Sequence, residues 1–263
     1  RVLEEPRYDA AARRAADFFM AGMKTKGDRL LHRFRDGEAA IHGFLEDYAF
    51  FMWGLIELYE TTFEPRYLAE AKQLAAQAAG LFWDESAGGG FLLTGHDAEE
   101  LVTRPKELYD GAIPSGNSAA LLMLLKIGRL TMDHALEDRA ASSFQVFAEQ
   151  IEKHPSAYAQ TLTALDFAIG PSREIVIAGD REDPVVVAMI HAVNSRFLPN
   201  QVTVFHPAAK EEAAKIEAAA PFLKAQTALN GKATAYVCEN YVCKIPTTDL
   251  AKFHELLDSH YSS

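Results

Sequence analysis

The chain has 263 residues, of which 49% are apolar and 24% charged, a composition typical of a globular protein with one large domain or two smaller ones. Its formal net charge is −11, and because nucleic acids and anionic membranes bind basic surfaces, we expect neither as a partner. Its apolar runs are far shorter than a membrane span and no signal peptide opens the chain, so we expect a cytoplasmic protein. The sequence begins at Arg1 without a methionine, and we expect it to be a piece of a longer protein.

Helices are predicted for the first two-thirds of the chain, and they alternate between two kinds. One kind carries an apolar stripe, such as Leu68, Ala71 and Ala75, and is expected to keep one face in water. The other kind is apolar on every side, as in AALLMLL at 119–125, and needs cover on nearly all sides. The striped helices are predicted at 7–24, 65–82 and 133–153, and the apolar ones at 46–60, 115–131 and 157–169.

This alternation predicts three hairpins, each pairing an outer striped helix with an inner covered one, as in part of an (α/α)6 barrel. The two long outer-to-inner loops, 25–45 and 83–114, would then lie at one end of the ring and are expected to form small β-hairpins there. The inner helices would begin at the same end. Because helix N-termini are positive and leave N–H groups unpaired, this end favours hydroxyl-rich or anionic ligands.

After a break at 169–174, short apolar strands alternate with helices. Strands are predicted at 174–179 and 201–206 and as a pair within 233–246, and helices at 183–197, 208–223 and 248–261. We therefore expect a protein that is mainly α with a C-terminal α/β part. Its two domains would be a partial barrel over 1–170 and a small, mostly parallel α/β layer over 171–263.

The only cysteines are Cys238 and Cys243, whose spacing is neither that of a redox Cys-x-x-Cys motif nor enough for a zinc site. Because nothing marks the chain as secreted, we expect two reduced structural thiols, with a disulfide across a tight hairpin as the alternative. Histidine pairs at metal-ligand spacing on one helix are absent, so neither a metal site nor a cofactor is expected.

Several long segments resemble one family. They are GFLEDYAFFMWGLIELYETTFEPRYL, LFWDESAGGGF, RPKELYDGAIPSGNSAA, AYAQTLTALDFAIGPSREIVIAGD and AYVCENYVCKIPTTD. They resemble the C-terminal portion of the YyaL / spermatogenesis-associated protein 20 family. The resemblance implies a longer protein with an N-terminal thioredoxin-like domain and a barrel similar to N-acylglucosamine 2-epimerases and six-hairpin glycosidases. The missing barrel half and the thioredoxin-like domain would then be partners, and the apolar faces of an open half-ring predict a homodimer as another.

Candidate catalytic groups lie where the two long loops enter the apolar helices. Glycoside cleavage normally needs two carboxylates, and Asp47 and Asp110 are the predicted pair. A sugar isomerase or epimerase needs a general base, for which His42 is predicted, with His32 and His96 as further histidines of the loops. The alternatives are structural: Glu46 or Asp47 as a helix cap, and the Asp110 segment as an ion-pair network that pins its loop.

Six residues near these groups are predicted to bind the substrate: Tyr48, Trp83, Arg104, Lys106, Tyr109 and Asn117. Arg104 and Lys106 could hold an anionic group, and aromatic rings such as Trp83 offer flat surfaces to a sugar. The favoured function is that of a carbohydrate-active protein, a sugar isomerase or epimerase or a glycoside hydrolase, with a small-molecule substrate. The alternative is a non-catalytic binding or scaffold module that works with a thioredoxin-like domain in redox or protein quality control.

Overall fold

The computed structural model describes residues 1–99 and 101–259, and these form two compact units. The helical unit contains Glu5–Gly128 and Asp133–Ala168, and the α/β unit contains Arg1–Glu4, Arg129–Met132 and the chain from Ile169 onward. The protein is thus mainly helical with a C-terminal α/β part, as predicted. The main division along the chain falls between Ala168 and Ile169.

The helices of the first unit follow the predicted pattern closely. They are α1 (Pro6–Gly22), α2 (Leu45–Thr62), α3 (Pro65–Phe82), α4 (Gly116–Thr131), α5 (His134–Lys153) and α6 (Ala159–Ile169), with a short 3-10 turn, η1 (Pro155–Ala157), before α6. Pro6 and Pro65 occupy first-turn positions, where the missing proline N–H costs no helical hydrogen bond. Phe63 ends α2 in the left-handed conformation, which turns the chain directly into α3.

The predicted cover of the apolar helices is confirmed fully for α4 alone. Nearly every residue of α4 is buried. In α2 one face is partly open, because Gly54 is exposed and Phe50 and Phe51 are half-buried. In α6 the prediction is wrong, since Thr163 and Asp166 are exposed and the side chain of Ile169 is 77% exposed. A low charge content alone does not distinguish a helix covered on all sides from one that lies at the margin of its unit.

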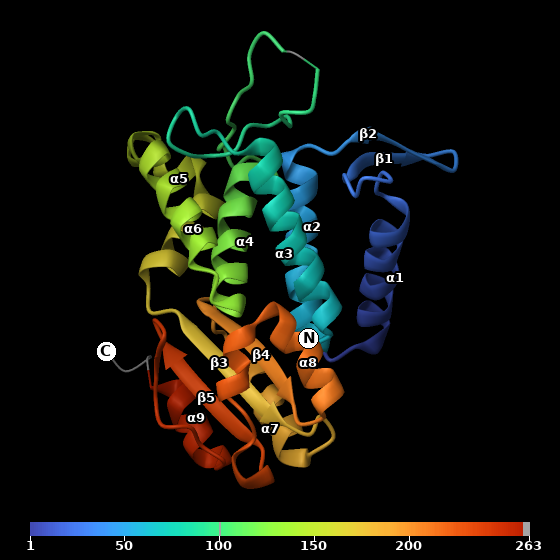
Figure 1. Ribbon diagram of the computed structural model, residues 1–263. Helices are drawn as coiled ribbons and strands as arrows, with labels where there is room; N and C mark the ends of the chain where they lie inside the picture. The colour runs from blue at the N-terminus through green and yellow to red at the C-terminus, as the bar shows by residue number, and fades with distance from the viewer. Residues whose placement is uncertain (100, 260–263) are drawn as a thin grey trace. The chain divides into compact units, whose positions relative to one another are not determined.

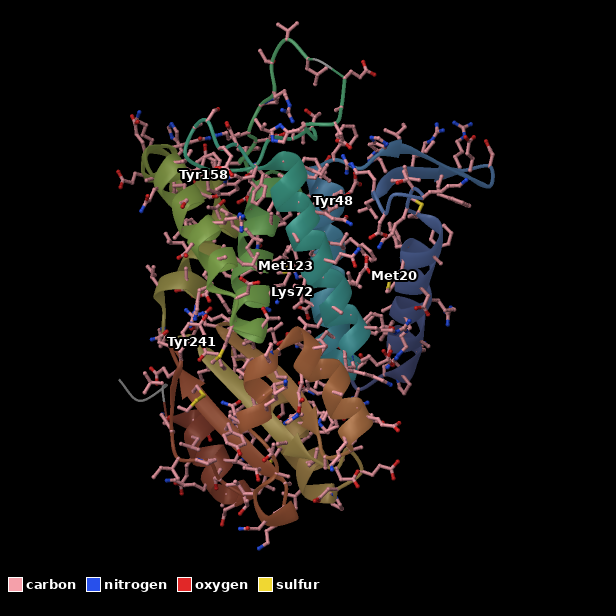
Figure 2. The ribbon with its side chains drawn as sticks, viewed as in Figure 1. Met20, Tyr48, Lys72, Met123, Tyr158 and Tyr241 are labelled. Carbon is pink, nitrogen blue, oxygen red and sulfur yellow. A yellow bond between two sulfur atoms is a disulfide. The ribbon has the colours of Figure 1, made fainter. Side chains whose placement is uncertain are left out.

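The two long loops and the starts of α2 and α4 lie at one end of the helical unit (Figure 1). Tyr48 and Tyr158 also lie near this end (Figure 2). The first loop contains the predicted hairpin, with β1 (Leu31–Arg35) antiparallel to β2 (Glu38–His42). In the second loop, the described residues contain only the isolated bridge between Trp83 and Phe91, so a hairpin of two strands is not formed there. Side chains of Arg104, Lys106 and Asn117 hold this loop instead.

The α/β unit is built on a four-stranded sheet in the order β4-β3-β5-β6. Its strands are β3 (Arg173–Gly179), β4 (Gln201–Pro207), β5 (Thr234–Glu239) and β6 (Val242–Cys243). Its helices are α7 (Pro184–Asn194), α8 (Lys210–Ala219) and α9 (Leu250–Asp258), with 3-10 turns η2 (Pro221–Ala225) and η3 (Leu229–Gly231). All residues of β3 are buried, as expected of a central strand covered on both faces. The helix predicted to reach Tyr261 is described only as far as Asp258, and Tyr261 lies outside the described residues.

The sheet is mixed, not mostly parallel as predicted. β3 pairs with β4 in parallel, but β5 is antiparallel to both β3 and β6. The register places Thr234, at the start of β5, opposite Ala178, near the end of β3. The chain therefore returns after β4, through α8, η2 and η3, to the end of the sheet at which β3 finishes. Strand pattern alone does not reveal this return, because α8 has the length of an ordinary crossover helix.

The cysteines are joined. Cys238 and Cys243 form a disulfide across the β5–β6 hairpin, so the expectation of reduced thiols is wrong and the alternative is confirmed. Strand register, which brings the two residues opposite each other, was the missing information. Among the described helices, none has both the length and the apolarity that crossing a bilayer requires.

Candidate functional site

The first turns of α2, α4 and α6 meet at the loop end of the helical unit. A Cβ added at Gly116, the first residue of α4, would lie 3.1 Å from the backbone nitrogen of Glu46 in α2. The carboxylate of Asp110 joins α4 to α6, because one oxygen accepts from the Ser115 N–H at 2.9 Å and the other from the Gln160 N–H at 2.8 Å. Three helix N-termini therefore gather around one place, where their partial positive charges add.

Asp110 is held by more donors than these two. Its first oxygen also accepts from the hydroxyl of Ser118 at 2.6 Å, and its second from the Thr161 N–H at 3.2 Å. The Ser118 hydroxyl in turn accepts from the hydroxyl of Thr161 at 3.0 Å. Asp110 thus caps the first turns of two helices, the arrangement that satisfies otherwise unpaired N–H groups.

Asp47 occupies the third position of α2 and has two partners. Its carboxylate accepts from the Phe44 N–H at 2.7 Å, as in a capping box, and lies 2.9 Å from Nδ1 of His32. The imidazole also contacts the ring of Phe44, with centroids 5.1 Å apart. A carboxylate on Nδ1 fixes the orientation of a histidine and leaves Nε2 to face another partner.

The predicted base His42 has a different neighbour. Its side chain is 51% exposed, and Nδ1 lies 3.6 Å from Asp97, not beside Asp47. Strand register explains why, because Leu31 is paired with His42 and the next residue, His32, points to the opposite face of the hairpin. Asp97 is also bound by Arg29, whose guanidinium holds the pKa of that carboxyl below its usual value.

The predicted substrate-binding cations are engaged within their own loop. Arg104 contacts Nδ1 of His96 at 2.9 Å and donates to the carbonyl of Thr94. Lys106 donates to the carbonyl of Gly89 at 2.7 Å and pairs with Asp84 at 2.8 Å. The hydrogen bond from Lys106 to Asp84, together with one from Ser86, lowers the pKa of Asp84 to about 2.

Three other predicted residues also bind the protein itself. Asn117 accepts from the Phe91 N–H at 2.8 Å and donates to the Phe91 and Glu107 carbonyls, both at 2.9 Å. Trp83 is buried edge-on against Phe91, with ring centroids 5.1 Å apart. Tyr48 is fully buried, and its hydroxyl accepts from the Leu30 N–H at 3.0 Å. Tyr109 differs from these, since its side chain is 60% exposed.

Two hollows adjoin the helix starts. The first, which we name the mouth pocket, has a volume of about 240 Å³ and is lined by the starts of α2 and α4 and by loop residues Leu93, Glu107, Tyr109 and 111–115. The polar residues of this lining are Glu46, Glu107, Tyr109, Ser115 and Asn117. The second, the side pocket, has a volume of about 560 Å³ between α1 and α2 and is mainly apolar. His32 and Asp47 lie in the lining of the side pocket.

Glu46 and Ile113 line both pockets. Of the predicted site residues, Tyr109 and Asn117 line the mouth pocket and Asp47 the side pocket. The remaining ones border neither of these two hollows; they are His42, Tyr48, Trp83, Arg104, Lys106 and Asp110. The structure therefore brings together only part of the predicted set.

Glu46 and Glu107 were not among the predicted site residues, and Glu46 was considered only as a helix cap. Within the residues that the structure describes, neither carboxylate has a hydrogen-bond or ion-pair partner. Glu46 is half-buried and Glu107 exposed, and both line the mouth pocket. The sequence did contain a signal for Glu46. In a capping box the third residue of the helix, here Asp47, binds the backbone, and the carboxylate of the second residue, Glu46, is left without this role.

Comparison with known proteins identifies relatives. The chain is 35% identical over 215 residues to human spermatogenesis-associated protein 20, which is 82% of this chain and 27% of that protein. It is 33% identical to the rat protein of the same name over the same shares, and 27% identical to the uncharacterized protein B0495.5 of Caenorhabditis elegans over 97% of this chain and 35% of that protein. No family model matches the chain. The chain spans about a quarter of the length of the mammalian relatives it matches, and it belongs to the spermatogenesis-associated protein 20 family.

Proposed function

We propose that the chain binds a neutral, monosaccharide-sized carbohydrate in the mouth pocket and that Glu46 and Glu107 are the groups that act on it. The observation that carries this proposal is that two glutamates whose carboxylates have no protein partner among the described residues line one hollow at the N-termini of two helices. The nearby carboxylates of Asp47, Asp84 and Asp110 are bound by backbone or cationic partners, so Glu46 and Glu107 are the two that this hollow leaves for a ligand.

The chemistry of the pocket favours a polyhydroxylated ligand. Carboxylate oxygens accept hydrogen bonds from sugar hydroxyls, and the exposed ring of Tyr109 offers a flat face to the apolar side of a sugar ring. The volume of about 240 Å³ lies below the roughly 300 Å³ at which pockets for drug-sized ligands begin. Two carboxylates would also repel an acidic sugar, which favours a neutral or amino sugar.

Two reaction classes are compatible with these groups. Hydrolysis of a glycoside would use Glu46 and Glu107 as the acid and the base or nucleophile. Isomerisation or epimerisation would use Glu46 or Glu107 as the general base at a carbon acid, since His32, oriented by Asp47, lines the side pocket and not the mouth pocket. In both cases two helix starts, those of α2 and α4, beside one hollow are what part of an (α/α)6 barrel would supply. This partial barrel and its sugar chemistry are part of the proposal.

Calorimetric titration tests the proposal with neutral monosaccharides and amino sugars and three variants. Glu46→Gln and Glu107→Gln keep the side-chain shape and remove the charge. The matched control is Glu152→Gln, at an exposed position near the end of α5. We expect at least one sugar to bind the wild type, with a loss of about tenfold or more in each pocket variant and none in the control. Absence of binding by every sugar, or equal binding by all variants, would refute the proposal.

A second function is favoured by the engagement of Asp110, Arg104, Lys106 and Asn117 within the loop network. Such a network suits a rigid binding or scaffold module, working with a thioredoxin-like domain of the longer family proteins in redox or protein quality control. A sugar panel without effect, combined with capture of a recombinant thioredoxin-like domain from a family member, would favour this second function. Light scattering of the isolated chain tests the homodimer that we propose as a further partner.

A further inference from the structure

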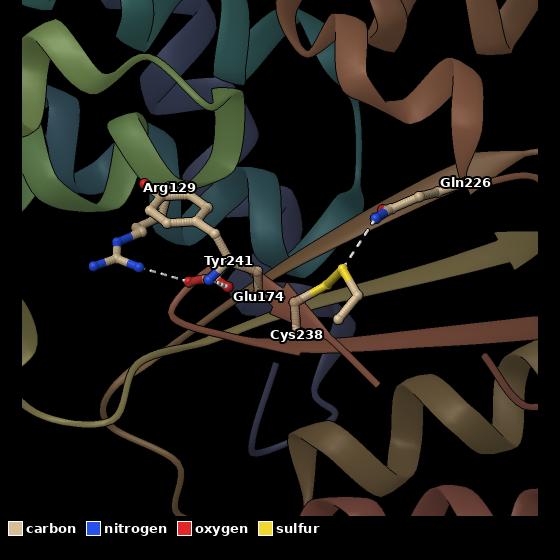
Figure 3. Close-up of a disulfide and its surroundings, with 6 residues drawn as sticks. Arg129, Glu174, Gln226, Cys238 and Tyr241 are labelled. Carbon is tan, nitrogen blue, oxygen red and sulfur yellow. Dashed lines mark hydrogen bonds and ion pairs between the residues drawn. A yellow bond between two sulfur atoms is a disulfide. The ribbon is translucent and has the colours of Figure 1, made fainter. Parts of the chain in front are cut away.

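The disulfide of the α/β unit joins a buried residue to an exposed one. Cys238 lies in β5 and is 2% exposed, whereas Cys243 lies in β6, where both residues are exposed. The side-chain amide of Gln226 donates to the sulfur of Cys243 at 3.7 Å (Figure 3). An attacking thiolate from solution can therefore reach the sulfur of Cys243, while that of Cys238 is shielded.

The hairpin closed by this disulfide covers a buried ion pair. Its turn contains Asn240 and Tyr241, both left-handed, with φ of 48° and 66°. The Tyr241 N–H donates to Glu174 at 3.0 Å, and the Tyr241 ring lies over the Arg129 guanidinium at 4.4 Å (Figure 3). Arg129 donates to the other oxygen of Glu174 at 2.9 Å. The turn thus completes the surroundings of two buried charges, which are costly to leave without partners.

The strands beside the disulfide are held by other bonds. The Lys244 N–H donates to the carbonyl of Val237 at 3.0 Å, and Ala235 and Thr247 exchange two backbone hydrogen bonds of 2.8 and 3.0 Å. The disulfide closes a loop with a sequence separation of 5, and short loops gain the least from a cross-link. Breaking the sulfur–sulfur bond would therefore leave the sheet paired and would release the turn alone.

We propose that Cys238–Cys243 is a thiol–disulfide exchange site for a dithiol reductant, with Cys243 as the attacked residue. A thiolate of the reductant bonds to the Cys243 sulfur, the Cys238–Cys243 bond breaks, and Cys238 leaves as a thiolate that takes up a proton. The second thiol of the reductant then attacks the mixed disulfide at the reductant's own sulfur and releases Cys243. The chain gains two electrons and two protons, and the dithiol becomes a disulfide. Reduction frees the Tyr241 turn from its cross-link, which couples the site to the Arg129–Glu174 pair.

Alkylation of the folded chain tests the exchange. The wild type is incubated with dithiothreitol or a thioredoxin in native buffer and its free thiols are trapped with iodoacetamide. The number of alkylated cysteines is then measured by intact-protein mass spectrometry. We expect Cys243 to be alkylated without denaturant and the buried Cys238 to react more slowly, and a reduced sample that has not been trapped should recover the disulfide on adding oxidised glutathione. Alkylation that requires denaturant would overturn the proposal, because it would mark a disulfide reached only on unfolding.

The asymmetry of attack is tested with single-cysteine variants and oxidised glutathione. Cys238→Ser leaves the exposed Cys243, which we expect to form a mixed disulfide about tenfold or more faster than the buried Cys238 of Cys243→Ser. Equal rates would overturn the assignment of Cys243.

Amide hydrogen exchange supplies a readout that needs no variant: reduction should speed exchange of the Tyr241 N–H by about tenfold or more and leave those of Ala235 and Thr247 unchanged. An unchanged Tyr241 rate would overturn the coupling to the turn. This site is independent of the carbohydrate proposal.

Discussion

Removing the carboxylate of Asp110 should destabilise the protein, whatever its effect on activity. In Asp110→Ala, the first turns of α4 and α6 lose their shared acceptor, and the Ser118 hydroxyl loses a partner at 2.6 Å. One lost helix cap costs about 1 kcal/mol and up to about 2, so two caps predict a loss of about 2–4 kcal/mol in the free energy of unfolding. Asp110→Asn keeps one acceptor oxygen but turns an amide donor toward N–H groups, and should cost about 1–3 kcal/mol.

Urea unfolding followed by circular dichroism measures this loss. The matched control is Asp138→Asn, because Asp138 is exposed on α5 and the same change of charge there should alter stability by no more than about 0.5 kcal/mol. If Asp110→Asn is as stable as the control, the capping role derived from the structure is wrong. A stable variant that loses sugar turnover would instead support the original prediction of Asp110 as a catalytic group.

Three further changes follow from single contacts. Because Lys106 lowers the pKa of Asp84 from 3.8 to about 2, the pair stabilises the fold above pH 4 and should lose this contribution as the pH falls toward 2, so Asp84→Asn should flatten the pH dependence of unfolding across that window. Gly90→Ala should cost about 1–3 kcal/mol, since φ is +79° there and a Cβ would lie 2.9 Å from the Phe147 ring; thermal unfolding measures it, and an unchanged melting temperature would contradict the close approach. Tyr48→Phe should cost about 1–3 kcal/mol in the same assay, because a buried backbone N–H loses its acceptor, and it should leave sugar binding intact.

The positions of the helices could be predicted from the sequence. Which faces of each helix other elements cover could not. The apolar run of α4 required cover on all sides, and α4 is buried along nearly its whole length. The similarly apolar α6 is covered on one side only. A low charge content shows that a helix can be buried, but it does not show which neighbours pack against it. The same limit applies to the sheet, where β5 could be recognised as a strand but its direction depends on the path of the preceding turns.

The site shows a comparable division. That Asp47, Asp110 and the loop histidines lie at one end of the helices followed from loop length and helix order. The register of the β1–β2 hairpin decides which histidine lies beside Asp47. A shift of one residue would turn His32 to the opposite face of the hairpin, away from Asp47. The bonds of Arg104 and Lys106 within the loop could not be predicted either, because both side chains are long enough to reach many partners.

Two acidic segments near the helix starts, Glu46–Asp47 and 107–110, share the same division of roles between aspartate and glutamate. Each contains an aspartate that binds backbone N–H groups, Asp47 or Asp110, and a nearby glutamate without such a partner, Glu46 or Glu107. The short aspartate side chain holds its oxygens close to the main chain, as a cap requires, whereas a glutamate at the second position of a helix extends away from it. Substituting an aspartate should therefore lower stability first, and substituting a glutamate should change ligand binding first. Stability and binding measured on the same four variants separate the groups that build the pocket from those that act in it.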